Sequence, residues 1–151
     1  MIDGVMTKKL KVIPDERGRL MECLRNDDDL FMGFGQLYMT TTFPGVVKGW
    51  HLHEVQFDNI VCVKGMIKLV LHDAREGSAT RGQTDEFFLG EHNPLLVRVP
   101  SGIWHGWKCV SPEEAYIVNA PTEVYKYDAP DQQELPHDSP EIPYDWNVKL
   151  R

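Results

Sequence analysis

The sequence predicts an all-β fold, a sandwich or barrel of short strands, on two observations. Its 12 glycines and 10 prolines are spread along the whole chain of 151 residues and leave few windows long enough for a helix. Between them lie short runs of β-branched and apolar residues, and many such runs with regular turns are typical of sandwiches and barrels. The length and the 42% hydrophobic content are those of one ordinary domain, so we expect a single domain over residues 1–151.

The expected elements can be followed along the chain. Asn26–Leu30 is expected to be an exposed turn or a short helix start. The clearest strands are expected at Asn59–Val63, Met66–Leu71, Leu95–Val99 and Ala115–Val118. Lys64-Gly65 separates the first two of these strands, which is a hairpin signal. From Asp128 the chain is dense in proline and aspartate, and we expect an irregular tail that wraps the barrel surface and is anchored by Tyr144 and Trp146.

The charge and the cysteines limit the partners and the location. A formal net charge of -7 argues against a nucleic-acid backbone or an anionic membrane as the main partner. The cysteines, Cys23, Cys62 and Cys109, are odd in number and form no CxxC pair, so we expect reduced thiols in a cytoplasmic protein. The N-terminal residues lack the apolar run of a signal peptide, and no 18-residue window is apolar enough to span a membrane.

Two spaced motifs hold the residues on which the chemistry depends. Residues 45–65 read GVVKGWHLHEVQFDNIVCVKG, which is a G-x5-H-x-H-x4-D-x6-G pattern. Residues 100–105 read PSGIWH and follow the pattern P-x-G-x-x-H. The side chains that the two patterns contribute are His51, His53, Asp58 and His105.

The spacing of these residues has a geometric meaning. His51 and His53 are two residues apart, so on a strand they share one face, and we expect both to point into the barrel. Asp58 begins the next strand and is expected within hydrogen-bond reach of one of them, directly or through one water. His105 follows a turn and enters from a separate strand. Three imidazoles and a carboxylate that converge inside a barrel form either a metal site or an acid–base site.

Both segments resemble the two motifs of the cupin family. The resemblance implies a cupin double-stranded β-helix, or jelly roll, of two facing antiparallel sheets. Asp58 stands where the family usually has glutamate, and Cys109 stands where it usually has asparagine.

Further segments resemble the dTDP-4-dehydrorhamnose 3,5-epimerases, which belong to the cupins and act on nucleotide-linked 4-keto-6-deoxysugars. The similar segments are DERGRLME at 15–22, GVVKGWH at 45–51, DAREGSATRG at 73–82 and VPSGIWHG at 99–106. Their order and approximate spacing hold over most of the chain. The resemblance implies an isomerase, a nucleotide-sugar epimerase or ketoisomerase, that works as a homodimer without a cofactor.

The resemblance also implies which residues act. His51 matches the base of the family. Contacts to the nucleotide sugar are implied for Arg17, Glu22, Gln36, Tyr38, Lys48, His53 and Arg75. Arginine is well suited to bind phosphate through two hydrogen bonds. We therefore expect Arg17, Lys48 and Arg75 to lie at the mouth of the barrel and to line one pocket with His51.

Several positions depart from the epimerase pattern. Asp58 stands near the place of the family's catalytic lysine, and Asn119 stands where the family has its tyrosine acid. His53 and Tyr38 are similar instead to positions of the sugar 3,4-ketoisomerases. A neutral asparagine does not donate a proton effectively, so 3,5-epimerisation itself is in doubt. Asn119, Tyr125 and Tyr127 are the candidates to replace the family's tyrosine as the proton donor.

The residues also suggest a mechanism. A ketone at C4 of a hexose acidifies the protons at C3 and C5, and histidine, with an ordinary pKa of about 6.5, suits their removal. We expect His51 to be the base, with its tautomer held by Asp58. We expect His105 and Lys48 to stabilise the enolate oxygen. Returning the proton to the opposite face inverts the centre, whereas returning it to another atom moves the carbonyl. The residues expected to be catalytic are His51, Asp58, His105 and Asn119.

Two other functions remain open at the level of the sequence. The first is a metal-dependent cupin enzyme with one divalent ion on His51, His53, Asp58 and His105. The second is a non-catalytic sugar-binding cupin. Metal content separates the first alternative from an epimerase, and solvent deuterium incorporation into a 4-keto sugar nucleotide separates the second.

Overall fold

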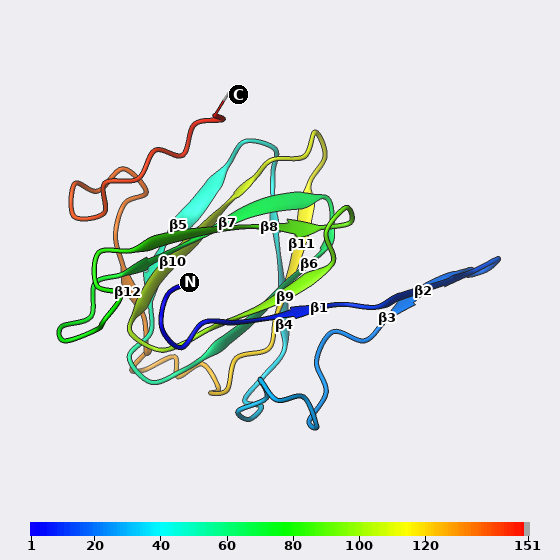
Figure 1. Cartoon of the computed structure of the whole chain (residues 1–151), viewed down its shortest axis with the longest axis horizontal. Helices are drawn as coiled ribbons and strands as arrows, with labels where there is room; N and C mark the ends of the chain where they lie inside the picture. Colours follow the sequence, from blue (N-terminus) through cyan, green and yellow to red (C-terminus); the bar gives the residue numbers. More distant parts are fainter. Residues whose placement is uncertain (150–151) are drawn as a thin grey trace.

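Two five-stranded antiparallel sheets face each other in the computed structural model, which describes residues 1–149 (Figure 1). The strands are β1 (Met6–Lys9), β2 (Val12–Asp15), β3 (Gly18–Met21), β4 (Tyr38–Thr42), β5 (Val47–Leu52), β6 (Asp58–Lys64), β7 (Met66–Asp73), β8 (Thr84–Gly90), β9 (Leu95–Val99), β10 (Ile103–Cys109), β11 (Ala115–Asn119) and β12 (Gln133–Glu134). The first sheet has the order β1-β9-β6-β11-β4, and the second has the order β12-β5-β10-β7-β8. β2 and β3 pair only with each other.

This arrangement confirms the predicted all-β cupin double-stranded β-helix. From β4 to β7, and again from β8 to β11, the chain crosses from one sheet to the other at every turn. Each sheet is therefore assembled from strands that are distant in the sequence. In this way His51 on β5 comes to lie opposite His105 on β10. The described residues contain no helix that could span a membrane.

The turn at Lys64-Gly65 departs from the predicted hairpin. β6 pairs with β9 and β11, whereas β7 pairs with β8 and β10, so the two strands belong to different sheets. The turn is an arch that joins the sheets. Gly65 has a φ of +70°, and a Cβ at this position would lie 2.7 Å from Oγ of Ser111 and 3.1 Å from Cα of Ala115. The prediction of a turn is confirmed, and the prediction of pairing across it is wrong.

The other predicted elements are confirmed with small changes at their ends. β6, β7 and β11 extend one or two residues beyond the predicted runs, and β9 has the predicted bounds. Residues 26–30 form a turn, in which Leu30 is buried. Leu30 packs with Leu10, Val61 and Leu96 on the outer face of the first sheet.

The main core fills the space between the two sheets. β7 shows how its residues divide between core and outer layer, because both faces of this strand are buried. Leu69 and Leu71 belong to the core between the sheets. Val70, between them in the sequence, packs on the other face with Trp50 and Trp146. The continuous apolar run that predicted β7 therefore reflects a strand covered on both sides.

The C-terminal tail covers the outer face of the second sheet, as predicted. Trp146 is buried and packs against Trp50 with ring centroids 5.0 Å apart. The hydroxyl of Tyr144 donates a hydrogen bond of 2.6 Å to Glu86 on β8. One part of the tail is regular, because β12 pairs with β5 opposite His51 and Leu52.

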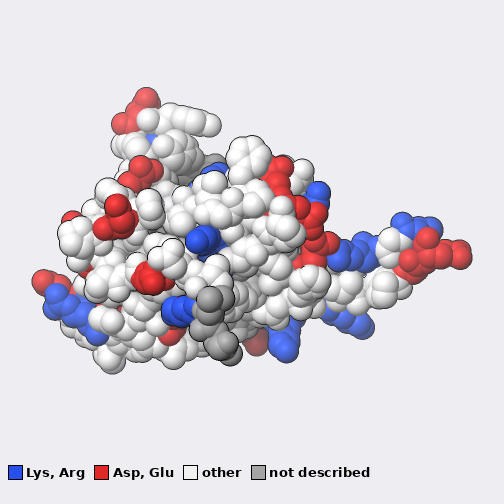
Figure 2. Space-filling model, turned by 90° about the horizontal axis from the view of Figure 1, so that it is seen from above, with Lys and Arg blue, Asp and Glu red and all other residues white. Residues whose placement is uncertain are grey.

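β2 and β3 form an arm (residues 12–21) that projects from the barrel (Figures 1 and 2). Charged side chains of both signs gather toward its end (Figure 2). Arg17 in the turn between the two strands pairs with Asp15 at 2.5 Å. Ile13 and Leu20 of the arm are large apolar residues exposed to solvent. The arm therefore carries Arg17 away from the body of its own chain.

Candidate active site

A cavity of about 210 Å³ opens between the two sheets. Its walls come from both sheets and from the C-terminal tail. The lining residues are Tyr38, Thr40, Lys48, His51, His53, Asp58, Ile60, His105, Trp107, Asn119 and Gln132. All of the residues expected to be catalytic are in this set, so the two motifs converge as predicted.

A bulge in β5 directs both Lys48 and His51 into the cavity. His51 lies opposite His105, and Lys48 lies opposite Trp107, so three steps along β5 match two steps along β10. Simple alternation would place residues three apart on opposite faces, and the extra residue brings Lys48 back to the inner face. The strands approach closely here, because a Cβ on Gly49 would lie 2.8 Å from Cα of Gly106. Glycine at this position therefore permits the bulge.

His51 faces the cavity with both ring nitrogens free. In the part of the chain that the structure describes, ring hydrogen bonds are made by His53, His72 and His105 but not by His51. Burial lowers the pKa of His51 to about 4, and the neighbouring imidazole of His105 adds to the shift. The rings of His51 and His105 lie 6.2 Å apart between centroids. At neutral pH His51 is therefore an uncharged imidazole with an available lone pair.

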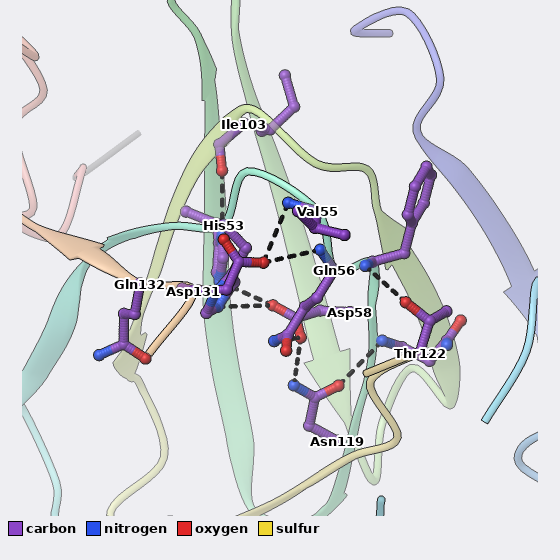
Figure 3. A network of polar contacts seen from close by, with 12 residues as sticks. His53, Val55, Gln56, Asp58, Ile103, Asn119, Thr122, Asp131 and Gln132 are labelled. Atoms are coloured by element: carbon purple, nitrogen blue, oxygen red, sulfur yellow. Dashed lines mark hydrogen bonds and ion pairs between the residues drawn. The ribbon is translucent and has the colours of Figure 1, made fainter. Parts of the chain in front are cut away.

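Asp58 lies at the centre of a polar network (Figure 3). Its Oδ1 accepts hydrogen bonds of 2.8 Å from Nε2 of Gln56 and Nδ2 of Asn119. Its Oδ2 lies 3.2 Å from Nε2 of His105 and 3.5 Å from Nε2 of His53. Burial raises the pKa of Asp58, but the hydrogen bond and charge of His105, the charge of His53 and the Asn119 amide lower it more, to below its ordinary value. Asp58 is therefore a buried carboxylate with one oxygen directed at two imidazoles.

Backbone carbonyls orient the two imidazoles beside Asp58. Nδ1 of His53 donates to the carbonyl oxygen of Asp131 in the tail. Nδ1 of His105 donates to the carbonyl oxygen of Ile103 at 3.1 Å. The carboxylate of Asp131 in turn accepts from three consecutive backbone N–H groups, those of residues 54–56, and so fixes the turn after β5 (Figure 3). The tail therefore helps to position His53.

Tyr38 reaches the cavity from the first sheet, opposite the wall that carries His51. Nδ2 of Asn119 donates to the Tyr38 hydroxyl at 2.9 Å as well as to Asp58. Burial and the charge of Asp58 raise the pKa of Tyr38. The phenol therefore keeps its proton at neutral pH, and the amide of Asn119 leaves that proton free to be donated elsewhere.

Lys48 brings a positive charge to the cavity. Its Nζ donates to Oγ1 of Thr40 at 2.8 Å and to the carbonyl oxygen of Thr41 at 2.7 Å. No carboxylate within residues 1–149 forms an ion pair with it. The charge is therefore available to an anionic group in the cavity.

Four residues expected to contact the substrate lie outside the cavity lining of their own chain: Arg17, Glu22, Gln36 and Arg75. The expectation that three cations line one pocket with His51 is therefore correct only for Lys48. Arg17 is on the projecting arm and is largely exposed. The guanidinium of Arg75 binds both oxygens of Asp73, with N–O distances of 2.9 to 3.0 Å.

The remaining two have other partners. Glu22 pairs with Arg25 at 3.0 Å on the surface. The side chain of Gln36 accepts from the backbone N–H of Tyr125 at 3.1 Å. The rings of Tyr125 and Tyr127 pack edge to face with centroids 5.1 Å apart, and neither residue is part of the cavity lining of its own chain.

Three of the four residues expected to bind a metal ion lie close together. His53, Asp58 and His105 offer ligand atoms that all lie within 4.8 Å of one another. His51 is not in this group, which corrects the predicted set of four. The difference arises because Nε2 of His53 and Nε2 of His105 both lie within 3.5 Å of Asp58, whereas the ring of His51 lies 6.2 Å from that of His105 between centroids.

Several lining residues were not predicted from the sequence. Thr40, Ile60 and Trp107 each lie two positions beyond a predicted site residue on the same strand, so strand alternation could have found them. Gln56 also was not predicted; it lies in the turn before β6, outside the cavity lining, and donates to Oδ1 of Asp58. Gln132 comes from the tail, and no periodic pattern indicates its place in the cavity wall.

Comparisons with known proteins agree with this geometry. The family model described as dTDP-4-dehydrorhamnose 3,5-epimerase matches residues 1–151. A probable low-salt glycan biosynthesis epimerase of Haloferax volcanii, Agl13, is 42% identical over 99% of this chain and 97% of its own length. The spore coat polysaccharide biosynthesis protein SpsL of Bacillus subtilis is 39% identical over the full length of both chains.

Solved structures show the same fold. A dTDP sugar isomerase of Desulfovibrio desulfuricans superposes with a TM-score of 0.91 at 30% identity, covering 96% of this chain and 92% of the other. NovW of Streptomyces spheroides, a 4-keto-6-deoxy sugar epimerase, gives a TM-score of 0.86 at 25% identity, covering 97% of this chain and 76% of the other. The similarity thus extends over the barrel, the arm and the tail together.

Proposed function

Since the chain belongs to the dTDP-4-dehydrorhamnose 3,5-epimerase family and is an enzyme of the carbohydrate epimerase type, we propose that it inverts a carbon next to the C4 ketone of a nucleotide-linked 4-keto-6-deoxysugar. The observation that carries this function is the free, uncharged imidazole of His51 in a cavity that also holds a cation and a phenol. A base, an oxyanion partner and an acid are the groups that such an inversion requires.

His51 acts as the base. It removes the proton from C3 or C5, the C–H electron pair becomes the C=C bond of an enolate, and the negative charge moves to the ketone oxygen. Lys48 stabilises that oxygen, because its ammonium group faces the cavity without a carboxylate partner among residues 1–149. The reaction begins and ends with the same oxidation state, so base and acid groups suffice for its balance.

Tyr38 acts as the proton donor in place of the tyrosine that the family carries at the position of Asn119. The support is its position on the sheet opposite His51, since a sugar ring between the sheets presents one face to each side chain. A proton taken by His51 from one face and supplied by Tyr38 to the other inverts the carbon. Asn119 positions Tyr38 through its hydrogen bond to the hydroxyl oxygen.

The His51→Asn variant tests the base. With a 4-keto-6-deoxy sugar nucleotide in deuterated water, we expect the wild-type protein to incorporate solvent deuterium next to the ketone. His51→Asn should lose on the order of 10²- to 10⁴-fold of this exchange rate and keep nucleotide-sugar binding. His72→Asn is the matched control, because His72 hydrogen-bonds Thr84 outside the cavity lining. Unchanged exchange in His51→Asn would contradict the assignment.

Tyr38→Phe separates the two halves of the reaction. The phenol is lost but the ring stays, so proton removal by His51 should continue while inversion slows by about 10²-fold or more. Deuterium incorporation measures the first half, and the configuration of the product measures the second. An equal loss of both would mean that Tyr38 is not the donor.

A homodimer would bring the arm to the substrate of a second copy. The support is the position of Arg17 on the arm, together with exposed apolar residues on and beside it, among them Leu20, Phe34 and Leu37. A groove of about 560 Å³, lined in part by Phe34 and Leu37, lies beside the root of the arm. Sedimentation should give about twice the 17.4 kDa chain mass.

Mixing two variants tests whether the site is shared. A mixed dimer contains one Arg17→Ala chain and one His51→Asn chain. If each arm serves the cavity of the partner chain, one site of this dimer carries both changes and the other site carries neither. If the arm serves the partner's cavity, a random mixture should recover about a quarter of wild-type activity. No recovery from a mixture whose exchange of subunits has been verified would mean that each chain is complete by itself.

The location is the cytoplasm. Cys23, Cys62 and Cys109 are free thiols, as a reducing compartment would keep them.

A further inference from the structure

A second pocket, of about 240 Å³, lies on the outer face of the second sheet. Strands β7, β8 and β10 contribute its floor, and the C-terminal tail contributes one wall. Lys68 precedes Leu69, whose side chain belongs to the core between the sheets, so strand alternation turns Lys68 to the outer face. No residue that lines this pocket also lines the cavity that holds His51. The sheet itself therefore separates the two sites.

Two lysines lie side by side on the floor of this outer pocket. Lys68 on β7 and Lys108 on β10 are direct partners across the two neighbouring strands. Like charges directly opposite each other destabilise a pair of strands. Lys68 is only 6% exposed, so water does little to screen the repulsion between the two ammonium groups. A pair of cations in this position calls for a counter-charge.

The contacts of the two lysines keep them charged without neutralising them. Both Nζ atoms donate to the carbonyl oxygen of Trp146, that of Lys108 at 3.0 Å and that of Lys68 at 3.5 Å. Nζ of Lys68 also lies 5.1 Å from the ring centroid of Tyr144 and 5.8 Å from that of Trp146, and aromatic faces attract an ammonium group. Within residues 1–149 neither lysine forms an ion pair.

Glu86 is the carboxylate that lines the pocket, and it already has two partners. Its Oε1 accepts from Nζ of Lys149 at 2.7 Å and from the hydroxyl of Tyr144 at 2.6 Å. Burial lowers the pKa of Lys68, and the nearby charge of Glu86 offsets this only in part. Three lysines and one glutamate line the pocket, so its described lining carries an excess of positive charge.

We propose that Lys68 and Lys108 bind the phosphate group of a small phosphate monoester. Such a group carries a charge of about −1.5 to −2 at neutral pH, which matches two ammonium groups, whereas a carboxylate would balance only one of them. Lysine binds phosphate as a compact point charge with three donors. The pocket is smaller than the roughly 300–1,000 Å³ of sites for drug-sized ligands, so the ester group must be small.

An apolar rim beside the lysines suits the organic part of the ester. Phe88 is the cross-strand partner of Lys68 on β8 and is 47% exposed. Val110 and Val148 line the same pocket and are exposed as well. A bound ester would therefore place its phosphate on the two lysines and its ring against Phe88. Since both lysines also hold the carbonyl of Trp146, the ligand would tie the tail to the second sheet.

Phenyl phosphate is the probe, and its binding is measured on the full-length protein without any sugar nucleotide. Calorimetry should detect binding, and the melting temperature should rise by about 5–10 °C at a probe concentration 100 times the Kd. Lys68→Met and Lys108→Met should each weaken the affinity by about 10- to 100-fold. Inorganic phosphate should bind more weakly than phenyl phosphate, because it leaves the apolar rim unfilled. Phenol should not bind at the same concentrations, because it lacks the charge.

Two control variants separate this pocket from other cations. Lys64→Met should bind as wild type does, because Lys64 also lies over a tyrosine ring, that of Tyr116 at 5.1 Å, but lies outside the pocket. Lys48→Met removes the cation of the cavity between the sheets, and binding to the outer pocket should survive it.

Circular dichroism verifies the fold of each variant, and Lys108→Met decides the matter if Lys68→Met does not fold. Three results would each overturn the site: no binding of phenyl phosphate by the wild type at about 10 mM, equal affinity in the wild type and a folded Lys68 or Lys108 variant, or binding that Lys48→Met abolishes. Equal binding of phenol would likewise show that the lysines do not hold the phosphate.

Discussion

Asp58 and Asp73 are both buried carboxylates at strand ends, and they differ in what their oxygens touch. Asp58 begins β6 and is 2% exposed, and Asp73 ends β7 and is fully buried. Both oxygens of Asp73 accept from Arg75, and Oδ2 also accepts from the hydroxyls of Ser78 and Thr80. Oδ2 of Asp58 meets only imidazole nitrogens within residues 1–149.

The difference separates a structural carboxylate from a functional one. Every acceptor site of Asp73 is filled by a donor of its own loop, so its charge stabilises the turn between β7 and β8. Asp58 keeps one oxygen for the imidazoles of His53 and His105, groups that can take up or release a proton. Asp73 lies in a segment that resembles the epimerases, whereas Asp58 lies in the cupin-like motif at a position that departs from the epimerase pattern. Substitutions at Asp58 should therefore act mainly on activity, and substitutions at Asp73 and its partners should act mainly on stability.

The largest effect is expected from Asp58→Asn, and it should fall on activity. The amide removes the charge beside His53 and His105, so proton exchange at the sugar should fall by about 10²- to 10⁴-fold. The free energy of unfolding should also fall, because the depressed pKa of Asp58 means that its charge stabilises the fold near neutral pH. The fall should be smaller than in Asp73→Asn, because the asparagine oxygen can still accept from Gln56 and Asn119 and no arginine loses its partner. Deuterium exchange and urea unfolding of the same preparation measure both quantities. A variant that loses stability but keeps its exchange rate would reverse the comparison.

Asp73→Asn should lose stability and keep most of its activity. It removes the acceptor of a buried ion pair with Arg75, which lies within 2.9 Å, and should lower the free energy of unfolding by about 3 kcal/mol. Urea unfolding measures this as a lower midpoint with an unchanged slope. At temperatures where the variant stays folded, its exchange rate should remain within a few-fold of wild type, since Asp73 is not part of the cavity lining.

The pH dependence of stability should separate the wild type from Asp73→Asn. Burial raises the pKa of Asp73, but the hydrogen bonds from Arg75, Ser78 and Thr80 lower it more, to well below its usual range. A depressed folded-state pKa gives stability that is complete above the unfolded-state pKa of about 3.9 and is lost as the pH falls below it. The stability gap between wild type and variant should therefore be full near neutral pH and narrow below about pH 4. If the difference in unfolding free energy instead grows as the pH falls, a group other than Asp73 determines the pH dependence.

The smallest effect is expected from Ser78→Ala. It removes one hydrogen bond of 2.6 Å to Asp73 while Arg75 and Thr80 remain, so the loss should be about 1.5 kcal/mol in unfolding free energy. Exchange activity should be unchanged. A loss as large as that of Asp73→Asn would mean that the hydroxyl, rather than the arginine, holds this carboxylate.

Much of the fold and of the site could be predicted because both depend on local spacing. Alternation directed His51 and His53 inward, and the turn before His105 brought it from a separate strand to the same cavity. The pairing across Lys64-Gly65 could not be predicted, because a turn signal does not say whether the next strand pairs with its predecessor or with β10. Lys48 reaches the cavity through a bulge that depends on the close approach of β10, which lies far along the sequence.

The positions of the two arginines show a second limit. Arg17 and Arg75 lie in segments that resemble phosphate contacts, yet one is on the arm and the other is held by Asp73. Whether an arginine meets a ligand depends on which carboxylates surround it and on which copy of the chain it faces. The carboxylates that hold these two arginines, Asp15 and Asp73, each stand two residues earlier in the sequence, whereas the copy of the chain that an arginine faces is not encoded in its neighbouring residues.

The short strand β12 has a consequence for how the chain stays soluble during folding. Without it, β5 would be the edge of the second sheet, with the unpaired N–H and C=O groups of Trp50 available to another chain. The backbone of Leu135 takes up both groups of Trp50, and Pro136, which has no N–H to offer, follows at once. The edge of β5, which carries His51, is thus covered by a segment that is too short to pair with a strand of another chain. A chain truncated before Asp131 would lose this protection along with the carbonyl that orients His53.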